Sequence, residues 1–130
     1  MDWQYDKGVH RRKHQWKHDE PGFEPGRRGQ VGKCPANITA EMAAAILNAG
    51  VPVFEGPDSE YPDRIYAYHA GAIYEAVPTV PGVSYHGYPW RGDLPGRTPP
   101  PRGVMERLAE QAESIGECRE FKRWLKKYGG

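Results

Sequence analysis

The chain has 130 residues, 38% of them hydrophobic, with 16 glycines and 13 prolines, and its formal net charge is +1. This length supports one domain with a single modest core and does not support two domains. A net charge so close to zero gives no overall field for a nucleic acid or a membrane surface, and no apolar run approaches the ~20 residues that a membrane-spanning helix needs.

The cysteine pattern and the first residues indicate a compartment. Cys34 and Cys118 lie far apart and form no CxxC motif. Two isolated cysteines do not make a disulfide scaffold, and a reducing cytoplasm is the default for such a chain. The first residues contain no apolar segment of the kind that a signal peptide has. We therefore predict a cytoplasmic protein, with export by a signal-free route left open.

Residues 1–36 are polar and are broken by glycine and proline. They predict a basic N-terminal arm, ordered only if Trp3, Trp16 and Phe23 pack on the remainder, residues 37–130, which we expect to form a single α+β domain. Within the arm, His10, His14 and His18 lie four residues apart, a spacing that a metal site could use. We favour a solvated basic segment that contacts phosphate, and we predict no metal.

A second basic segment of the arm reads GRRGQVGKC, residues 26–34. It does not match the phosphate-binding P-loop, because Arg27 stands where the first glycine belongs and Cys34 follows Lys33 in place of Ser or Thr. We expect a flexible basic turn in which Lys33 helps to bind an anion.

The remaining elements follow in chain order. Thr39 and Gly50 bracket a helix at about 39–49 as its N-cap and C′ residues. A three-stranded antiparallel meander occupies about 64–88, with turns at Ala70–Gly71 and Pro81–Gly82. Two C-terminal helices occupy about 103–128 and separate at Gly116, with Val104, Leu108, Ala112 and Ile115 sharing one face of the first. The fold class is α+β, with the small sheet packed against one preceding helix and two following ones.

The two turns fix which residues lie opposite each other. They pair Tyr66 with Glu75, Glu75 with Tyr88, and Val77 with His86, and they sort the sheet into two faces. One face is small and apolar and should pack on helices: Ile65, Ala67, Tyr74, Ala76, Val83, Tyr85 and Gly87. The other is too polar for a core and too aromatic for ordinary solvent-facing sheet: Arg64, Tyr66, Tyr68, Ile73, Glu75, Val77, Ser84, His86 and Tyr88.

The polar face predicts a site for an anionic ligand with a flat ring. An imidazole beside a carboxylate suits proton transfer, guanidinium groups bind phosphate, and aromatic rings stack on a base. The predicted catalytic residues are His86, Glu75, Arg64 and Arg91. The predicted substrate-binding residues are Tyr66, Tyr68, Tyr88, Trp90 and Lys33, with no metal or other cofactor. The structural alternative is that these aromatic residues serve packing alone, as they often do in strands.

This pattern favours a small metal-independent enzyme acting on a phosphodiester, most simply a toxin-type ribonuclease. Cleavage by the 2′-hydroxyl needs a base, an acid and cations for the developing charge. The same face would suit transfer of ADP-ribose from a dinucleotide. It would also suit a non-enzymatic module that binds a nucleotide, a nucleic acid or a protein, because Tyr, Trp and Arg dominate interface energetics. These alternatives stay open at this point, and we predict no membrane partner.

Overall fold

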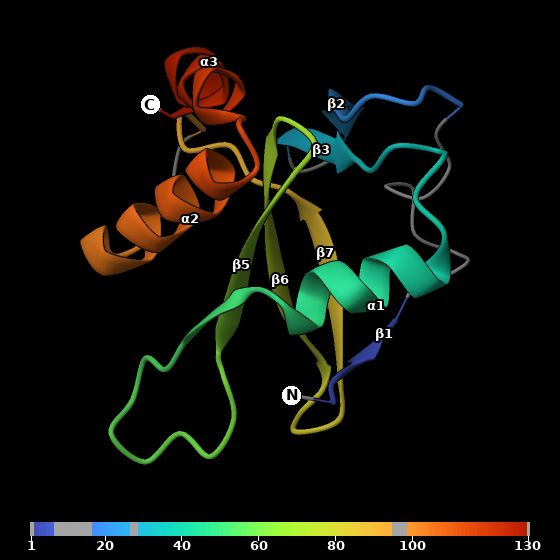
Figure 1. Ribbon diagram of the computed structural model, residues 1–130. Coiled ribbons are helices and arrows are strands. Elements are labelled where there is room, and N and C mark those ends of the chain that lie inside the picture. The colour runs from blue at the N-terminus through green and yellow to red at the C-terminus, as the bar shows by residue number, and fades with distance from the viewer. Residues whose placement is uncertain (1, 7–16, 27–28, 95–98, 130) are drawn as a thin grey trace.

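The computed structural model describes residues 2–6, 17–26, 29–94 and 99–129 (Figure 1). Its elements in chain order are β1 (Gln4–Tyr5), β2 (Gly22–Gly26), β3 (Gly29–Lys33), α1 (Ala40–Asn48), β4 (Val51–Val53), β5 (Arg64–His69), β6 (Ala72–Val80), β7 (Ser84–Pro89), α2 (Arg102–Ser114) and α3 (Cys118–Tyr128). Among the described residues, no helix is long and apolar enough to span a membrane.

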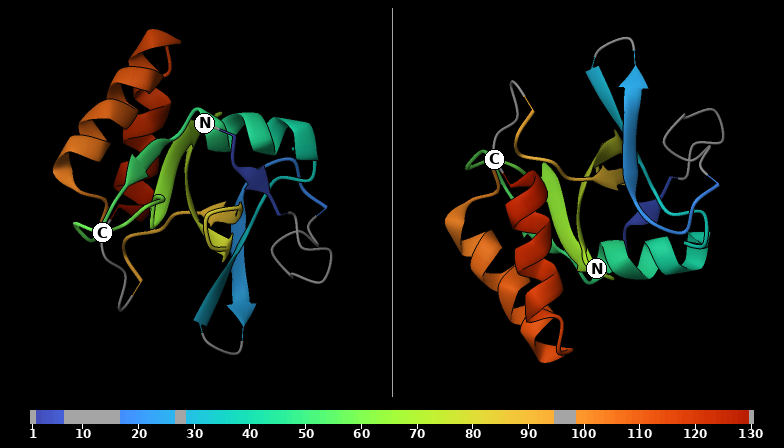
Figure 2. Two further views of the ribbon diagram at one scale, coloured as in Figure 1. Left: turned by 90° about the horizontal axis from the view of Figure 1, so that it is seen from below. Right: turned by 90° about the horizontal axis from the view of Figure 1, so that it is seen from above.

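The main sheet has five strands in the order β1-β7-β6-β5-β4, and β2 and β3 form a separate antiparallel hairpin. β1 runs parallel to β7, and the other neighbours are antiparallel. The sheet lies between α1 on one side and the α2–α3 pair on the other (Figure 2). The predicted α+β class is confirmed. The predicted three-stranded meander is the centre of the sheet, and β1 and β4 extend it at both edges.

Both predicted turns are present. Ala70 and Gly71 have φ values of 46° and 88°, as a two-residue hairpin turn of the primed type requires. Gly82 has a φ of 77°, and the Val83 N–H donates to the Val80 carbonyl at 2.9 Å, which makes Pro81–Gly82 the centre of a type II turn. The predicted pairs Tyr66–Glu75, Glu75–Tyr88 and Val77–His86 are therefore confirmed.

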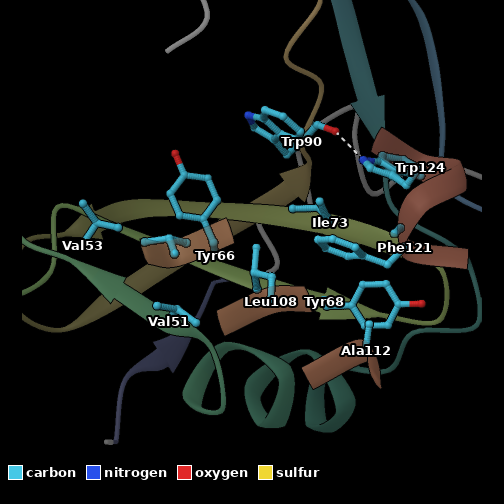
Figure 3. Packing of buried hydrophobic residues seen from close by; sticks show 12 residues of the cluster. Val51, Val53, Tyr66, Tyr68, Ile73, Trp90, Leu108, Ala112, Phe121 and Trp124 are labelled. Carbon is cyan, nitrogen blue, oxygen red and sulfur yellow. Dashed lines mark hydrogen bonds between the residues drawn. The ribbon is translucent and has the colours of Figure 1, made fainter. Parts of the chain in front are cut away.

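The sheet carries a core on each face. Leu47 of α1 packs with Ile65, Ala76 and Tyr85, as predicted for the apolar face. The larger core lies under α2 and α3 and includes Tyr66, Tyr68 and Ile73 (Figure 3). The expectation that the polar face cannot form a core is wrong for the part of that face that carries Tyr66, Tyr68 and Ile73. The apolar sides of α2 and α3 need a surface to cover them, and these three side chains supply it.

The C-terminal helices separate where the sequence predicts. Gly116 has a φ of 74°, a left-handed conformation that glycine adopts without strain. Val104, Leu108 and Ala112 are buried on one side of α2, but Ile115 is 60% exposed. The predicted place of Ile115 on the buried face is wrong, because α2 ends at Ser114 and the helical spacing stops with it.

The N-terminal segment packs against the body through aromatic rings. The centroid of the Trp3 ring lies 5.4 Å from that of Tyr85, and the centroid of Phe23 lies 5.0 Å from that of Tyr128. Trp16 lies outside the described residues. The β2–β3 hairpin thus packs against α3 through Phe23. The backbone of Gln4 and Tyr5 pairs with β7.

Gly50, two residues after the end of α1, lies closely against β5. A Cβ atom at this position would lie 2.6 Å from Ile65 Cγ2 and 2.8 Å from the Tyr66 carbonyl oxygen. We expect Gly50→Ala to lower the free energy of unfolding by roughly 1–3 kcal/mol, because the strand must move. Gly103→Ala in α2 is the control: nothing lies within 4 Å of its Cβ, and alanine should stabilise the helix by up to about 1 kcal/mol. Urea unfolding of both variants measures the difference, and equal effects would contradict the close approach at Gly50.

Candidate functional site

A buried carboxylate, Glu75 on β6, organises the candidate site. The Tyr66 hydroxyl donates to its Oε2 atom and the Tyr88 hydroxyl donates to its Oε1 atom, both at 2.5 Å. Arg64 Nη1 lies 3.5 Å from Oε2, and the Glu75 side chain is only 6% exposed. The three partners come from neighbouring strands in the confirmed register. The sequence therefore predicted correctly that Tyr66 and Tyr88 lie opposite Glu75 on the neighbouring strands.

Arg64, at the start of β5, connects the cluster to the surface. Its Nη1 donates to the Tyr66 hydroxyl at 2.7 Å, and the side chain is 18% exposed. Its Nε lies 2.5 Å from Glu55 Oε1, an ion pair without the alignment of a hydrogen bond. Burial disfavours the charged guanidinium, but Tyr66, Glu55 and Glu75 outweigh it and raise the pKa of Arg64. The sequence analysis missed Glu55, although β4 pairs directly with β5.

Tyr66 stays a neutral hydrogen-bond donor in this cluster. Burial, followed by its hydrogen bond to Glu75 and the charge of that carboxylate, raises the pKa of Tyr66 far above the ordinary range of a phenol. Its proton therefore remains available to Glu75 at any physiological pH. Packed apolar residues would hold strands together as well as such a buried ionic cluster does. Charged groups that are buried and interlocked in this way are often associated with function.

His86 lies beside this cluster on β7. It is opposite Val77, two residues from Tyr88 along the strand, and it is half-buried. Its Nδ1 atom lies 2.7 Å from Thr79 Oγ1. Thr79 is an extra residue in β6, at a bulge between Pro78 and Val80. Thr79 therefore orients the His86 ring through Nδ1, a role that the sequence analysis gave to Glu75. The sequence analysis missed Thr79 because a two-residue turn alone gives no sign of the bulge.

The site divides into a covered and an open part. α2 packs on β4 and β5, and α3 packs on β6. Tyr68 lies under these helices, 9% exposed, and its hydroxyl donates to Glu117 Oε1 at 2.8 Å. Tyr66 and Trp90 are 0% and 1% exposed. These three rings therefore present no face to a ligand in this structure, whereas His86 and Tyr88 are half-buried.

Trp90 is held by a hydrogen bond to its backbone carbonyl, and its indole nitrogen has no hydrogen-bond acceptor. The Trp90 carbonyl accepts a hydrogen bond from Trp124 Nε1 at 3.1 Å. Trp90 Nε1 is buried without an acceptor. Figure 3 shows it on the side of the ring that faces away from Trp124, toward the side on which the Tyr66 hydroxyl points. A buried donor without an acceptor costs about 1–3 kcal/mol of stability. Such donors are uncommon in native structures.

The two remaining predicted residues are held elsewhere. The guanidinium carbon of Arg91 lies 5.0 Å from the ring centre of Phe23 and 5.1 Å from that of Tyr128, and the group binds Asp93 through two hydrogen bonds. Lys33 is 2% exposed, and its Nζ atom lies 2.9 Å from Glu24 Oε1. Arg91 therefore connects the hairpin to α3, and Lys33 stabilises the hairpin.

The metal alternative falls mostly outside the described residues. His10 and His14 are not described, and His18 is exposed. In the part of the chain that is described, no three His, Cys, Asp or Glu side chains gather as metal ligands would. Arg27, in the basic turn, also lies outside the described part.

A hollow lies on the other face of the sheet, between α1 and β5–β7. It encloses about 450 Å³ with its open mouth included, and its walls are almost wholly apolar, from Ile46, Leu47, Ala67 and their neighbours. Tyr74 borders it, and burial, followed by the nearby Cys34 and Tyr5, raises the pKa of Tyr74. The hollow carries no group suited to phosphate chemistry.

No family model, curated protein or solved structure matches this chain. The functional argument therefore rests on the geometry of the site.

Proposed function

We propose that the protein cleaves RNA phosphodiester bonds without a metal ion, with β7 as the reactive strand. One observation supports this more than any other. His86 and Tyr88 lie two residues apart on β7, on the face that holds Glu75 and Arg64, and both are half-buried. A base, an aromatic ring and a guanidinium group are thereby gathered around an open strand.

The proposed reaction uses the 2′-hydroxyl of RNA. In the proposed reaction, the protonated Nδ1 of His86 donates to Thr79 Oγ1, which lies 2.7 Å away, and Nε2 acts as the base. Nε2 removes the proton of the 2′-hydroxyl, whose oxygen attacks the phosphorus while the 5′-oxygen leaves and takes a proton from solvent. Arg64 stabilises the negative charge that builds up on the phosphate oxygens. A phosphate must compete with Glu55 for Arg64, and the exposure of Glu55 makes that exchange accessible.

Tyr88 is the residue that we assign to base contact. Its ring is half-buried, and its hydroxyl is bonded to the buried Glu75, which fixes the ring's direction. A fixed aromatic ring loses little conformational freedom when a base stacks on it, and such stacking contributes about 1–3 kcal/mol per base. Glu75 and Tyr66 are positioning residues: they hold Tyr88 and Arg64 in place from the interior.

The experiment is incubation of the full chain with labelled total RNA, with and without a chelator. We expect cleavage at equal rates in both and products that end in a 2′,3′-cyclic phosphate. DNA of matching sequence should stay intact because it lacks the attacking hydroxyl. RNA that stays intact under both conditions would overturn the proposal, and cleavage that stops with chelator would overturn its metal-free mechanism.

A non-enzymatic binding module is the second candidate. The observation that favours it is the pairing of Arg64 with Glu55, Tyr66 and Glu75, which leaves the guanidinium strongly engaged before any ligand arrives. In that case the open part of β7 would bind a nucleotide or nucleic acid without reacting. Substitution of His86 separates the two candidates.

A further inference from the structure

The outer side of α3 carries a dense group of cations. All five are exposed: Arg119, Lys122, Arg123, Lys126 and Lys127. The single acid of the helix, Glu120, is half-buried. The 11 residues of α3 span about 16 Å. A chain of net charge +1 thus concentrates positive charge on one helix.

The apolar side chains of α3 are already occupied. Phe121 and Trp124 are 5% and 7% exposed and belong to the core, and Leu125 packs against it. A helix that lies in a membrane surface inserts its apolar face between the lipids. α3 has no such face to offer, so its outer side fits a polyanion that binds through charge alone.

α3 also lies close to the proposed reactive strand. Trp124 Nε1 donates to the Trp90 carbonyl at 3.1 Å, and the Gly92 N–H donates to the Tyr128 carbonyl at 2.7 Å. Phe121 and Trp124 pack on the same face of the sheet that carries Tyr66 and Ile73. The segment that follows Tyr88 therefore leads directly to the last turn of α3.

We propose that the outer side of α3 binds the phosphate backbone of single-stranded RNA whose reacting linkage lies at His86 and Tyr88. This inference rests on the proposed function and extends it from a single linkage to a strand. Each lysine or arginine that neutralises a phosphate releases a counterion, so binding should weaken steeply with added salt. RNA long enough to reach α3 should therefore bind more tightly than a dinucleotide.

The test measures binding of a 2′-O-methyl RNA 12-mer, which offers no attacking hydroxyl, to the full chain over a range of salt concentrations. The variant is Arg119→Gln with Arg123→Gln on α3. The matched control is Arg102→Gln with Arg107→Gln on α2, where both arginines are also exposed. The α3 variant should reduce the salt slope by about 1.4 and the affinity at 0.1 M salt by about 25-fold. The α2 variant should change neither.

Equal losses in the two variants, or no loss in the α3 variant, would overturn the proposal. So would binding to vesicles containing phosphatidylserine that depends on the α3 arginines while RNA binding does not. Cleavage of ordinary RNA by the unmodified chain is scored separately. An α3-dependent RNA affinity without any cleavage would support the binding surface and overturn the proposed reaction, so the two failures are distinguishable.

Discussion

Replacement of His86 by alanine should lower the rate of RNA cleavage about 100- to 10,000-fold, the range that a general acid–base group contributes. His86 is the residue of β7 that the proposed mechanism uses as its base. Affinity for the 2′-O-methyl 12-mer should change little, because the phosphate and base contacts that we propose come from other residues. Single-turnover cleavage of a labelled oligonucleotide gives the rate, and the 12-mer gives the affinity.

Two controls make this result specific. His69→Ala removes a half-buried histidine at the end of β5, away from the open part of β7, and should leave the cleavage rate unchanged. Tyr88→Ala removes the ring that we assign to base contact. If His86→Ala cleaves RNA as fast as the unmodified chain, His86 is not the base. If the unmodified chain does not cleave and both His86→Ala and Tyr88→Ala weaken binding alike, the face is a binding module.

The second large effect concerns stability. Glu75→Gln should reduce the free energy of unfolding by about 3 kcal/mol, because two tyrosine hydroxyls and a largely buried guanidinium lose their charged partner. The change keeps the side-chain volume, so the loss reports on charge and hydrogen bonding. Urea unfolding measures it, and the thermal midpoint should fall by roughly 10 °C.

Glu55→Gln is the matched control. Glu55 pairs with the same Arg64, but its side chain is 51% exposed compared with 6% for Glu75. Exposed ion pairs contribute about 0–1 kcal/mol, so Glu55→Gln should change stability little. Similar losses in the two variants would show that burial of the carboxylate does not determine its contribution, and the interpretation of Glu75 as the centre of the cluster would fail.

The central sheet could be predicted because its registers are encoded locally. Ala70–Gly71 and Pro81–Gly82 permit only a few turn conformations, and a turn fixes the residues that lie opposite each other. The cluster of Arg64, Tyr66, Glu75 and Tyr88 follows from these turns alone. A continuation of the same alternation beyond Tyr88 would have placed Trp90, and not Arg91, on that face.

The coverage of the sheet could not be predicted in the same way. Whether a tyrosine such as Tyr68 is an open ring or part of a core depends on where α2 and α3 pack, and those helices are distant in sequence. The hairpin around Phe23 is stabilised by rings of α3 and has no local signal beyond its glycines. The orientation of His86 depends on Thr79, which reaches it only because of the bulge in β6.

Arg91 holds three distant parts of the chain together, since its guanidinium lies near the rings of both Phe23 and Tyr128. During synthesis on the ribosome, the hairpin is made about 100 residues before its partner in α3, and polypeptide growth proceeds at about 5–20 residues per second. The polar residues of the hairpin must therefore keep it in solution for several seconds, until α3 has been synthesised and Tyr128 packs against Phe23.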